Sequence, residues 1–179
     1  MAEIVQRENI VLRQKASPVP QKNINSPRIK RIISAMKTAL DSQQDGIAIA
    51  APQIGESVRI FIVSEKVFDL SESVEARQEQ QESLNPEKYQ KLVFINPTIT
   101  RLSRTKEFME EGCLSVRWLY GKVKRSTKAT VRAYDEKGEL FERGASGILA
   151  QVFQHEIDHL DGVLFIDKAI DVTEMNPTE

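Results

Sequence analysis

Apolar residues recur at helical spacing in two segments of the chain. The first segment begins at Ser26, a residue type that caps helices, with a proline at the first helical position, and it ends before Gly46. Its apolar positions share one helical face: Ile29, Ile32, Ile33, Met36 and Leu40. The second segment begins near Ser146 and ends by Gly162. The pattern therefore predicts two amphipathic helices.

Shorter apolar runs between these segments predict β-strands. They are VRIFIV (58–63), KLVFINPTIT (91–100) and KATVRAY (128–134), and the last leads through the turn signal DEKG into ELFER, which predicts a hairpin. Residues 64–91 are rich in Glu, Gln and Ser and contain Pro86, which predicts a solvated excursion, with room for a short helix, rather than a domain boundary. Several strands with only two helices predict an α+β fold rather than a regular βαβ array.

The second helix carries an acidic residue on its apolar side. At about 100° per residue, the core-facing arc holds Ile148, Leu149, Val152, Phe153, Ile157 and Leu160. The opposite side holds Gln151, Gln154, Asp158 and Asp161. Glu156 falls inside the apolar arc, and His155 and His159 lie together at one of its edges. A carboxylate in that position is costly unless it is paired or used, so we expect burial to raise the pKa of Glu156.

His155 and His159 are the two histidines of the chain, four residues apart and next to Glu156. Two imidazoles one turn apart can bind a single metal ion, and a neighbouring glutamate can act as a base toward metal-bound water. The alternative is that both histidines are ordinary polar residues at a face boundary, with Glu156 reaching solvent, because short H-E-x-x-H matches also arise by chance. The acidic residue inside the apolar arc favours the metal.

The third metal ligand stays open on the residues alone. A catalytic metal generally has three protein ligands and keeps one position for water or substrate. Downstream of the histidines, the oxygen donors are Asp161, Asp167, Asp171 and Glu174. Upstream, Cys113 is the single cysteine of the chain, and it follows a glycine that allows close approach of the backbone. A lone cysteine is by default a small buried hydrophobe, so both Cys113 and a downstream carboxylate remain candidates.

Composition indicates an ordinary globular protein. The chain has 179 residues, 40% of them hydrophobic and 28% charged, which suits one compact domain over residues 1–179. A formal net charge of −1 does not indicate direct nucleic-acid binding. No apolar run approaches the roughly 20 residues of a membrane span, and the first residues lack the apolar stretch of a signal peptide. One cysteine allows no internal disulfide. We expect a cytoplasmic monomer with no membrane partner.

Three stretches, in this order, resemble the three motifs of the peptide deformylases. They are GIAIAAPQIG (46–55), EGCLSV (111–116) and QHEIDHLDG (154–162), and VLRQKASPV near the start echoes the family's N-terminal pattern. The resemblance covers nearly the whole chain. It implies an α+β domain in which antiparallel β-sheets pack around a central helix that carries the HEIDH metal motif, with a further helix near the N-terminus.

The resemblance also implies a reaction and its residues. The positions that match the family's metal ligands are Cys113, His155 and His159. Glu156 matches the general acid/base, and Gln53 with the backbone N–H of Leu114 matches the oxyanion site. The implied metal is Fe(II) in the cell, with Ni(II), Co(II) or Zn(II) accepted. The implied substrate is a nascent peptide that begins with N-formylmethionine, cut to formate and a free amino terminus, with transient ribosome association compatible with that role.

The expected substrate-binding positions are Gly46, Ile47, Ala48, Glu111, Gly112, Ile148 and Val152. Ile47 and the backbone around Ala48 and Gly112 match family positions that pair with the peptide main chain. Ile148 and Val152 flank the histidines on the helical wheel, where they form either an apolar slot for the methionine side chain or plain core.

The sequence departs from the family's usual pattern at two places. Ala48 stands where a second glycine is usual, so a backbone with positive φ would be disfavoured there. Arg117-Trp118 stands where many members have Pro-Gly, which puts substrate preference in doubt. In addition, only about a dozen residues follow Asp167, too few for the long C-terminal helix with which some members dock on the ribosome.

Two other functions compete with this hypothesis. An H-E-x-x-H metallopeptidase that cuts internal peptide bonds would need a third ligand downstream of the histidines and could dispense with Cys113. A non-catalytic deformylase-like protein would bind formylated peptides or metal without releasing formate. The presence of Glu156, Gln53 and all three matching ligands favours the enzyme.

Overall fold

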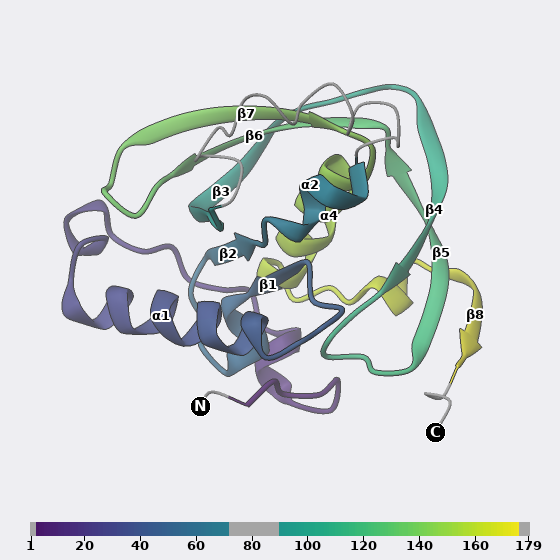
Figure 1. Ribbon diagram of the computed structural model, residues 1–179, viewed down its shortest axis with the longest axis horizontal. Helices are drawn as coiled ribbons and strands as arrows, with labels where there is room; N and C mark the ends of the chain where they lie inside the picture. Colours follow the sequence, from purple (N-terminus) through teal and green to yellow (C-terminus); the bar gives the residue numbers. More distant parts are fainter. Residues whose placement is uncertain (1–2, 72–89, 176–179) are drawn as a thin grey trace.

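The computed structural model describes residues 3–71 and 90–175 (Figure 1). Its α-helices are α1 (Pro27–Asp41), α2 (Lys66–Ser71) and α4 (Gly147–Leu160). Its 3-10 helices are η1 (Ile10–Arg13), η2 (Gln21–Asn23), η3 (Ala51–Ile54) and η5 (Phe165–Asp167). Its strands are β1 (Ala48–Ala50), β2 (Ile60–Val63), β3 (Leu92–Leu102), β4 (Lys106–Gly112), β5 (Leu119–Ser126), β6 (Lys128–Tyr134), β7 (Leu140–Ser146) and β8 (Ile170–Glu174).

The strands form two antiparallel sheets around α4. The larger sheet has the order β1-β2-β3-β6-β7 and the smaller has the order β4-β5-β8. Helix α4 contacts β1, β2, β6 and β7 of the larger sheet and β5 of the smaller one. In Figure 1, α4 lies in the middle of the molecule, with α1 along one side and the β4-β5 ribbon along another. The predicted α+β fold with antiparallel sheets around a central helix is confirmed.

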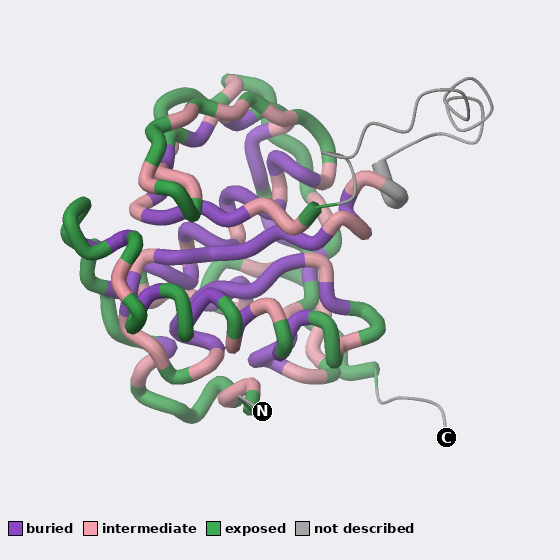
Figure 2. Tube along the Cα trace, turned by 60° about the vertical axis from the view of Figure 1, so that its left-hand side comes forward, coloured by how far each residue is buried: buried purple, intermediate pink, exposed green. Residues whose placement is uncertain are grey.

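The larger sheet is buried on both faces where β1, β2 and β3 run. Alternate residues of each strand point to opposite faces. Phe61 and Phe94 face α4, where their rings stack at 4.4 Å and Phe153 of the helix meets Phe94 edge-on at 5.1 Å. Ile60 and Ile62 face the other way and pack against the apolar side of α1. Figure 2 shows the buried parts of the chain gathered in the interior. A strand buried on both faces is continuously apolar, which explains the IFIV run.

Both predicted helices are confirmed at their expected ends. The Ser26 hydroxyl accepts a hydrogen bond from Ile29 N, and all five predicted apolar residues of α1 are buried. In α4, one residue of the expected polar side is buried instead. Gln154 donates from Nε2 to the carbonyls of Ser126 and Ala150 and accepts from Ser126 N, all within 3.0 Å. The chain between β5 and β6 covers that side, and the amide is tolerated there because each of its polar atoms is paired.

The predicted strands and hairpin are present, but four strands were not predicted. Strand β1 is apolar and buried but only three residues long, and β5 alternates buried and exposed residues. Strands β4 and β8 lack a clear apolar signal: every residue of β8 is exposed, and β4 has one buried residue. The excursion over residues 64–91 also differs from expectation at its start. Val67 of α2 is fully buried in the core, so that part is not solvated. Residues 72–89 lie outside the described residues. None of the described helices is long and apolar enough to cross a membrane.

Candidate active site

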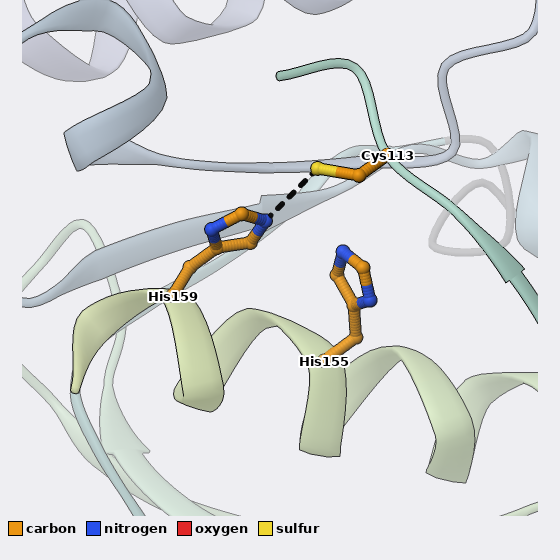
Figure 3. A group of neighbouring side chains, drawn as sticks. All are labelled: Cys113, His155 and His159. Carbon is orange, nitrogen blue, oxygen red and sulfur yellow. Dashed lines mark hydrogen bonds between the residues drawn. The ribbon is translucent and has the colours of Figure 1, made fainter. Parts of the chain in front are cut away.

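Helix α4 and the loop after β4 bring together one cysteine and two histidines. The candidate ligand atoms of Cys113, His155 and His159 all lie within 4.8 Å of one another. The Sγ of Cys113 is 3.1 Å from the Nε2 of His159, and Figure 3 shows both imidazoles rising from α4 toward the thiol. This set of one sulfur and two imidazole nitrogens has the composition of a catalytic transition-metal site with a position left for water or substrate.

The downstream carboxylates lie elsewhere, so Cys113 is the third candidate ligand. Asp161 pairs with Arg59 and Asp167 pairs with Arg13. Asp171 and Glu174 are exposed on β8. A metallopeptidase-type site with a downstream ligand is therefore not formed by the described residues.

His155 is oriented by a buried carboxylate. Its Nδ1 donates to Oε2 of Glu111 at 2.8 Å, which leaves Nε2 available to a metal. Burial by itself would raise the pKa of Glu111, but hydrogen bonds from His155 and Arg125 lower that pKa to about 2. Glu111 is therefore ionised at neutral pH. The family resemblance predicts that Glu111 binds substrate, and the structure adds that it orients the His155 ring.

Arg125 connects Glu111 to helix α4. Its guanidinium binds both carboxylate oxygens of Glu111, at 2.7 and 3.0 Å, and Oδ2 of Asp158 at 2.6 Å. Lys168 then binds Asp158 from outside. Arg125, which is only 4% exposed, was not among the predicted site residues. A signal was present, because Gly121, Val123 and Arg125 share the inward face of β5 and alternate with exposed lysines, but that strand itself was not predicted.

Glu156 is buried beside the cluster, as the helical wheel predicted. It is 4% exposed, and its Oε2 has no hydrogen-bond partner among the described residues. Burial raises the pKa of Glu156 to about 7, although both histidines act in the opposite direction. The Nδ1 of His159 is a second buried polar atom without a partner there. Unpaired buried polar atoms are rare in native proteins and are typical of sites that bind an ion or water.

Cys113 has the ionisation state that a metal ligand needs. Burial would raise the pKa of its thiol, but the charge of His159 and hydrogen bonds to both histidines lower that pKa to about 5. The thiolate is the metal-binding form of cysteine. A thiolate and two imidazoles fit a divalent transition metal, and the buried Glu156 carboxylate stands beside them without a pairing partner for Oε2 among the described residues.

Gln53 presents its amide N–H group to the cluster. Its Oε1 accepts from Ala50 N at 2.8 Å, which turns Nε2 toward Ser115 Oγ at 3.2 Å and Cys113 Sγ at 3.5 Å. The short helix η3 holds Gln53 in place, and Leu114 is the residue after the cysteine. Both residues line the cleft together with Cys113, His155 and Glu156.

A cleft of about 310 Å³ leads to the cluster. It is lined by six of the seven expected substrate-binding residues: Ile47, Ala48, Glu111, Gly112, Ile148 and Val152. The seventh, Gly46, is buried behind it, against the end of α1. Ala48 pairs with Val63 in β1 and is not among the residues with positive φ, so its methyl group imposes no strain. Val152 belongs to the core as well as the cleft wall.

Comparisons with known proteins agree with this geometry. The family model described as polypeptide deformylase matches residues 1–175. A peptide deformylase from Desulforudis audaxviator is 38% identical over 167 residues, which cover 93% of this chain and 92% of that protein. The class I type b peptide deformylase from Acinetobacter baumannii, solved with actinonin, superposes with a TM-score of 0.77 at 29% identity, over 95% of this chain and 99% of that one.

A second structure of the Acinetobacter baumannii enzyme contains Met-Ala-Ser. It superposes with a TM-score of 0.75 at 30% identity and covers 94% of this chain and 99% of that one. Sequence and structure therefore agree over nearly the full length of this chain and of its relatives. The chain belongs to the polypeptide deformylase family.

Proposed function

We propose that this chain removes the N-formyl group from peptides that begin with N-formylmethionine, giving formate and a free amino terminus. The observation that carries the proposal is the buried Glu156 carboxylate, unpaired on one oxygen, beside Cys113, His155 and His159 in a cleft. Membership of the deformylase family supports the same reaction.

Cys113, His155 and His159 would hold one divalent metal ion. We propose Fe(II) as the metal in the cell, with Ni(II), Co(II) or Zn(II) as substitutes, because a thiolate with two imidazoles suits these metals better than Mg²⁺ or Ca²⁺. Such an ion, when bound, activates a water molecule and polarises the formyl oxygen. Glu111 supports the ligand set by fixing the His155 ring through Nδ1.

Glu156 moves the protons of the reaction. Glu156 lines the same cleft as Cys113 and His155, so its carboxylate can take a proton from the attacking water. The same carboxyl group then returns a proton to the departing amine nitrogen, which must leave as a neutral group. Its apolar surroundings suit this double role, because neither protonation state is stabilised by a permanent ion-pair partner.

Gln53 and Leu114 would stabilise the negative charge that develops on the formyl oxygen. The hydrogen bond from Ala50 N orients the Gln53 amide, and its Nε2 lies 3.5 Å from Cys113 Sγ, beside the candidate metal ligands. A well-placed N–H donor of this kind contributes on the order of 3 kcal/mol to the transition state. We assign the second donor to the backbone N–H of Leu114.

The peptide would bind between the edge strands of the two sheets. Strand β1 ends the larger sheet and β4 ends the smaller one, and residues at both edges line the cleft. An extended peptide can add there as a strand, using the backbone around Ile47, Ala48 and Gly112. Ile148 and Val152 would form the apolar wall for the methionine side chain.

The first test is formate release from formyl-Met-Ala-Ser by protein prepared without oxygen and loaded with Fe(II) or Ni(II). We expect release by the wild type and a loss of several orders of magnitude in Glu156→Gln with bound metal unchanged. Glu107→Gln, an exposed position on β4, is the matched control and should retain full activity. Cleavage of an unformylated peptide would instead support a metallopeptidase, and metal and peptide binding without formate would support the non-catalytic alternative.

We also propose that the protein acts as a cytoplasmic monomer of one domain with transient access to the ribosome. The near-neutral charge and single cysteine support a soluble protein in a reducing compartment. Sedimentation of the metal-loaded protein at several concentrations tests the monomer.

A further inference from the structure

Trp118 adopts a backbone conformation that its side chain disfavours. Its φ is +67°, in the left-handed region where bulky residues are rare. Trp118 is also 36% exposed, so it gains less stabilisation from burial than a core tryptophan would. Strained residues of this kind persist where the surrounding structure holds them, and they cluster at ligand sites.

Contacts from two distant segments hold Trp118 in place. Arg117 reaches the loop after α1, where it binds Oδ2 of Asp45 at 2.6 Å and Oε1 of Gln43 at 2.6 Å. The hydrogen bond from Arg117 lowers the pKa of Asp45, so this pair is ionised at neutral pH. On the other side, Met175 N, just beyond β8, donates to the Trp118 carbonyl at 2.8 Å.

The indole lines the cleft that leads to the candidate metal ligands. Trp118 shares its lining with His155 and Glu156, and the neighbouring Leu119 and Tyr120 also belong to it. The Cζ of Arg117 lies 5.5 Å from the ring centroid of Trp118, within cation–π range. The ring is therefore a partly exposed apolar surface, fixed by its neighbours, in the wall of the cleft.

We propose that Trp118 is a specificity-determining residue whose indole packs against an apolar or aromatic side chain at the second or third position of the formylated peptide. This inference rests on the proposed function, because the peptide must enter with its formyl end at Glu156. The later side chains then lie toward solvent, where the exposed part of the indole is found. Arg117 already supplies a cation to the ring, so a lysine or arginine in the peptide gains little there. Apolar and aromatic side chains retain the full benefit of burial against an aromatic ring.

The test compares peptides that differ only at the second or third position. Wild-type kcat/KM should be about 10-fold higher for formyl-Met-Phe-Ser than for formyl-Met-Gly-Ser, or for formyl-Met-Ala-Phe than for formyl-Met-Ala-Gly. In Trp118→Gly this ratio should fall to about 2 or less through KM, with kcat unchanged. Trp118→Phe should retain most of the ratio. Glycine accepts positive φ, so Trp118→Gly should fold.

Phe108→Ala is the matched control. Phe108 is an exposed aromatic residue with a cation, Lys124, over its ring, but it does not line the cleft. Its substitution should leave both ratios unchanged. An unaltered ratio in Trp118→Gly, or an equal loss for all four peptides, would overturn the proposal.

A second readout separates this proposal from the proposed function. Trp118 is the single tryptophan of the chain, so its fluorescence reports directly on what covers it. Saturating Met-Phe-Ser or Met-Ala-Phe should shift the emission to shorter wavelength, and Met-Gly-Ser should not. Identical emission with all three peptides would refute the contact. Because these are product peptides, the result stands even if no formylated peptide is cleaved.

Discussion

At the scale of single residues, the site depends on buried charged side chains that form ion pairs and hydrogen bonds with one another. Glu111 and Arg125 form a paired, doubly hydrogen-bonded contact that is nearly free of solvent, and the same carboxylate fixes His155. Removing one member of such a pair leaves the other charge buried without a partner. The orientation of a candidate metal ligand therefore depends on an arginine from a different sheet strand.

Glu111→Gln tests this dependence. The amide cannot neutralise Arg125 and gives His155 a weaker acceptor, so we expect about 3 kcal/mol or more of lost stability and a 10- to 100-fold loss of metal affinity. Denaturant unfolding and competition with a chelator measure the two effects. Glu107→Gln on the same strand should change neither. Unchanged metal affinity in Glu111→Gln would show that His155 needs no such support.

Gln53 offers a second residue-scale prediction. Gln53→Ala removes the amide N–H, and kcat should fall about 100-fold while bound metal is retained. Gln53→Glu keeps an acceptor for Ala50 N but also lacks the donor, and it should be similarly impaired. Formate release under saturating substrate measures both. Full activity in Gln53→Glu would remove Gln53 from the oxyanion site.

At the scale of elements, α4 has to end sharply so that the chain can return beside the N-terminal segment. Gly162 follows the helix with a φ of +77°, and a Cβ placed on it would lie 2.7 Å from the Arg13 carbonyl oxygen. The N-terminal segment is also tied to the end of the helix by the hydrogen bond from Ala16 N to the Leu160 carbonyl. The end of the metal-bearing helix is therefore a packing contact as well as a turn.

Gly162→Ala should be more damaging than Gly55→Ala. Both glycines have positive φ, so both substitutions carry a backbone penalty of about 1 kcal/mol. Only Gly162 has backbone atoms in the way; an added Cβ at Gly55 meets nothing within 4 Å. We expect the Gly162 variant to unfold at clearly lower denaturant concentration than the Gly55 variant. Equal midpoints would mean that the Arg13 segment moves aside freely.

At the scale of the whole molecule, an ion pair joins residues from opposite ends of the chain. Arg13 of η1 binds Asp167 of η5, and the Asp167 carboxylate also accepts from Leu164 N. Burial would raise the pKa of Asp167, but these hydrogen bonds and the nearby charges lower it. The stabilisation is thus present above the unfolded-state pKa, about 4, and is lost as the pH falls through the lower folded-state value.

Asp167→Asn should therefore be destabilising at pH 7 and nearly neutral in strong acid. The wild type and the variant should differ in unfolding free energy at neutral pH, and the difference should shrink as the pH falls below about 4. The pair is partly exposed, so 1 M salt should also reduce the difference. Urea titrations across pH measure it. A difference that persists at the lowest pH at which the protein still folds would assign the effect to packing.

The sequence by itself determined the two helices, the buried strands β2 and β3, the β6–β7 hairpin and the burial of Glu156. These features follow from local periodicity, because an apolar helical face or a strand buried on both sides requires apolar residues at fixed, short spacings along the chain. Strands β4 and β8 carry little apolar pattern, since they depend mainly on backbone pairing with β5. On the residues alone the sequence left the third ligand open.

Apart from the family resemblance, which already pointed to Cys113, only the tertiary structure placed Cys113 beside the histidines. It alone also showed the burial of Gln154, the role of Arg125 and the placement of Trp118 in the cleft. Each of these depends on contacts between residues far apart in the chain, such as Cys113 with His159 or Arg117 with Asp45. The local sequence pattern does not show which loop packs against which helix. These contacts form only when the chain folds and α4 packs against both sheets.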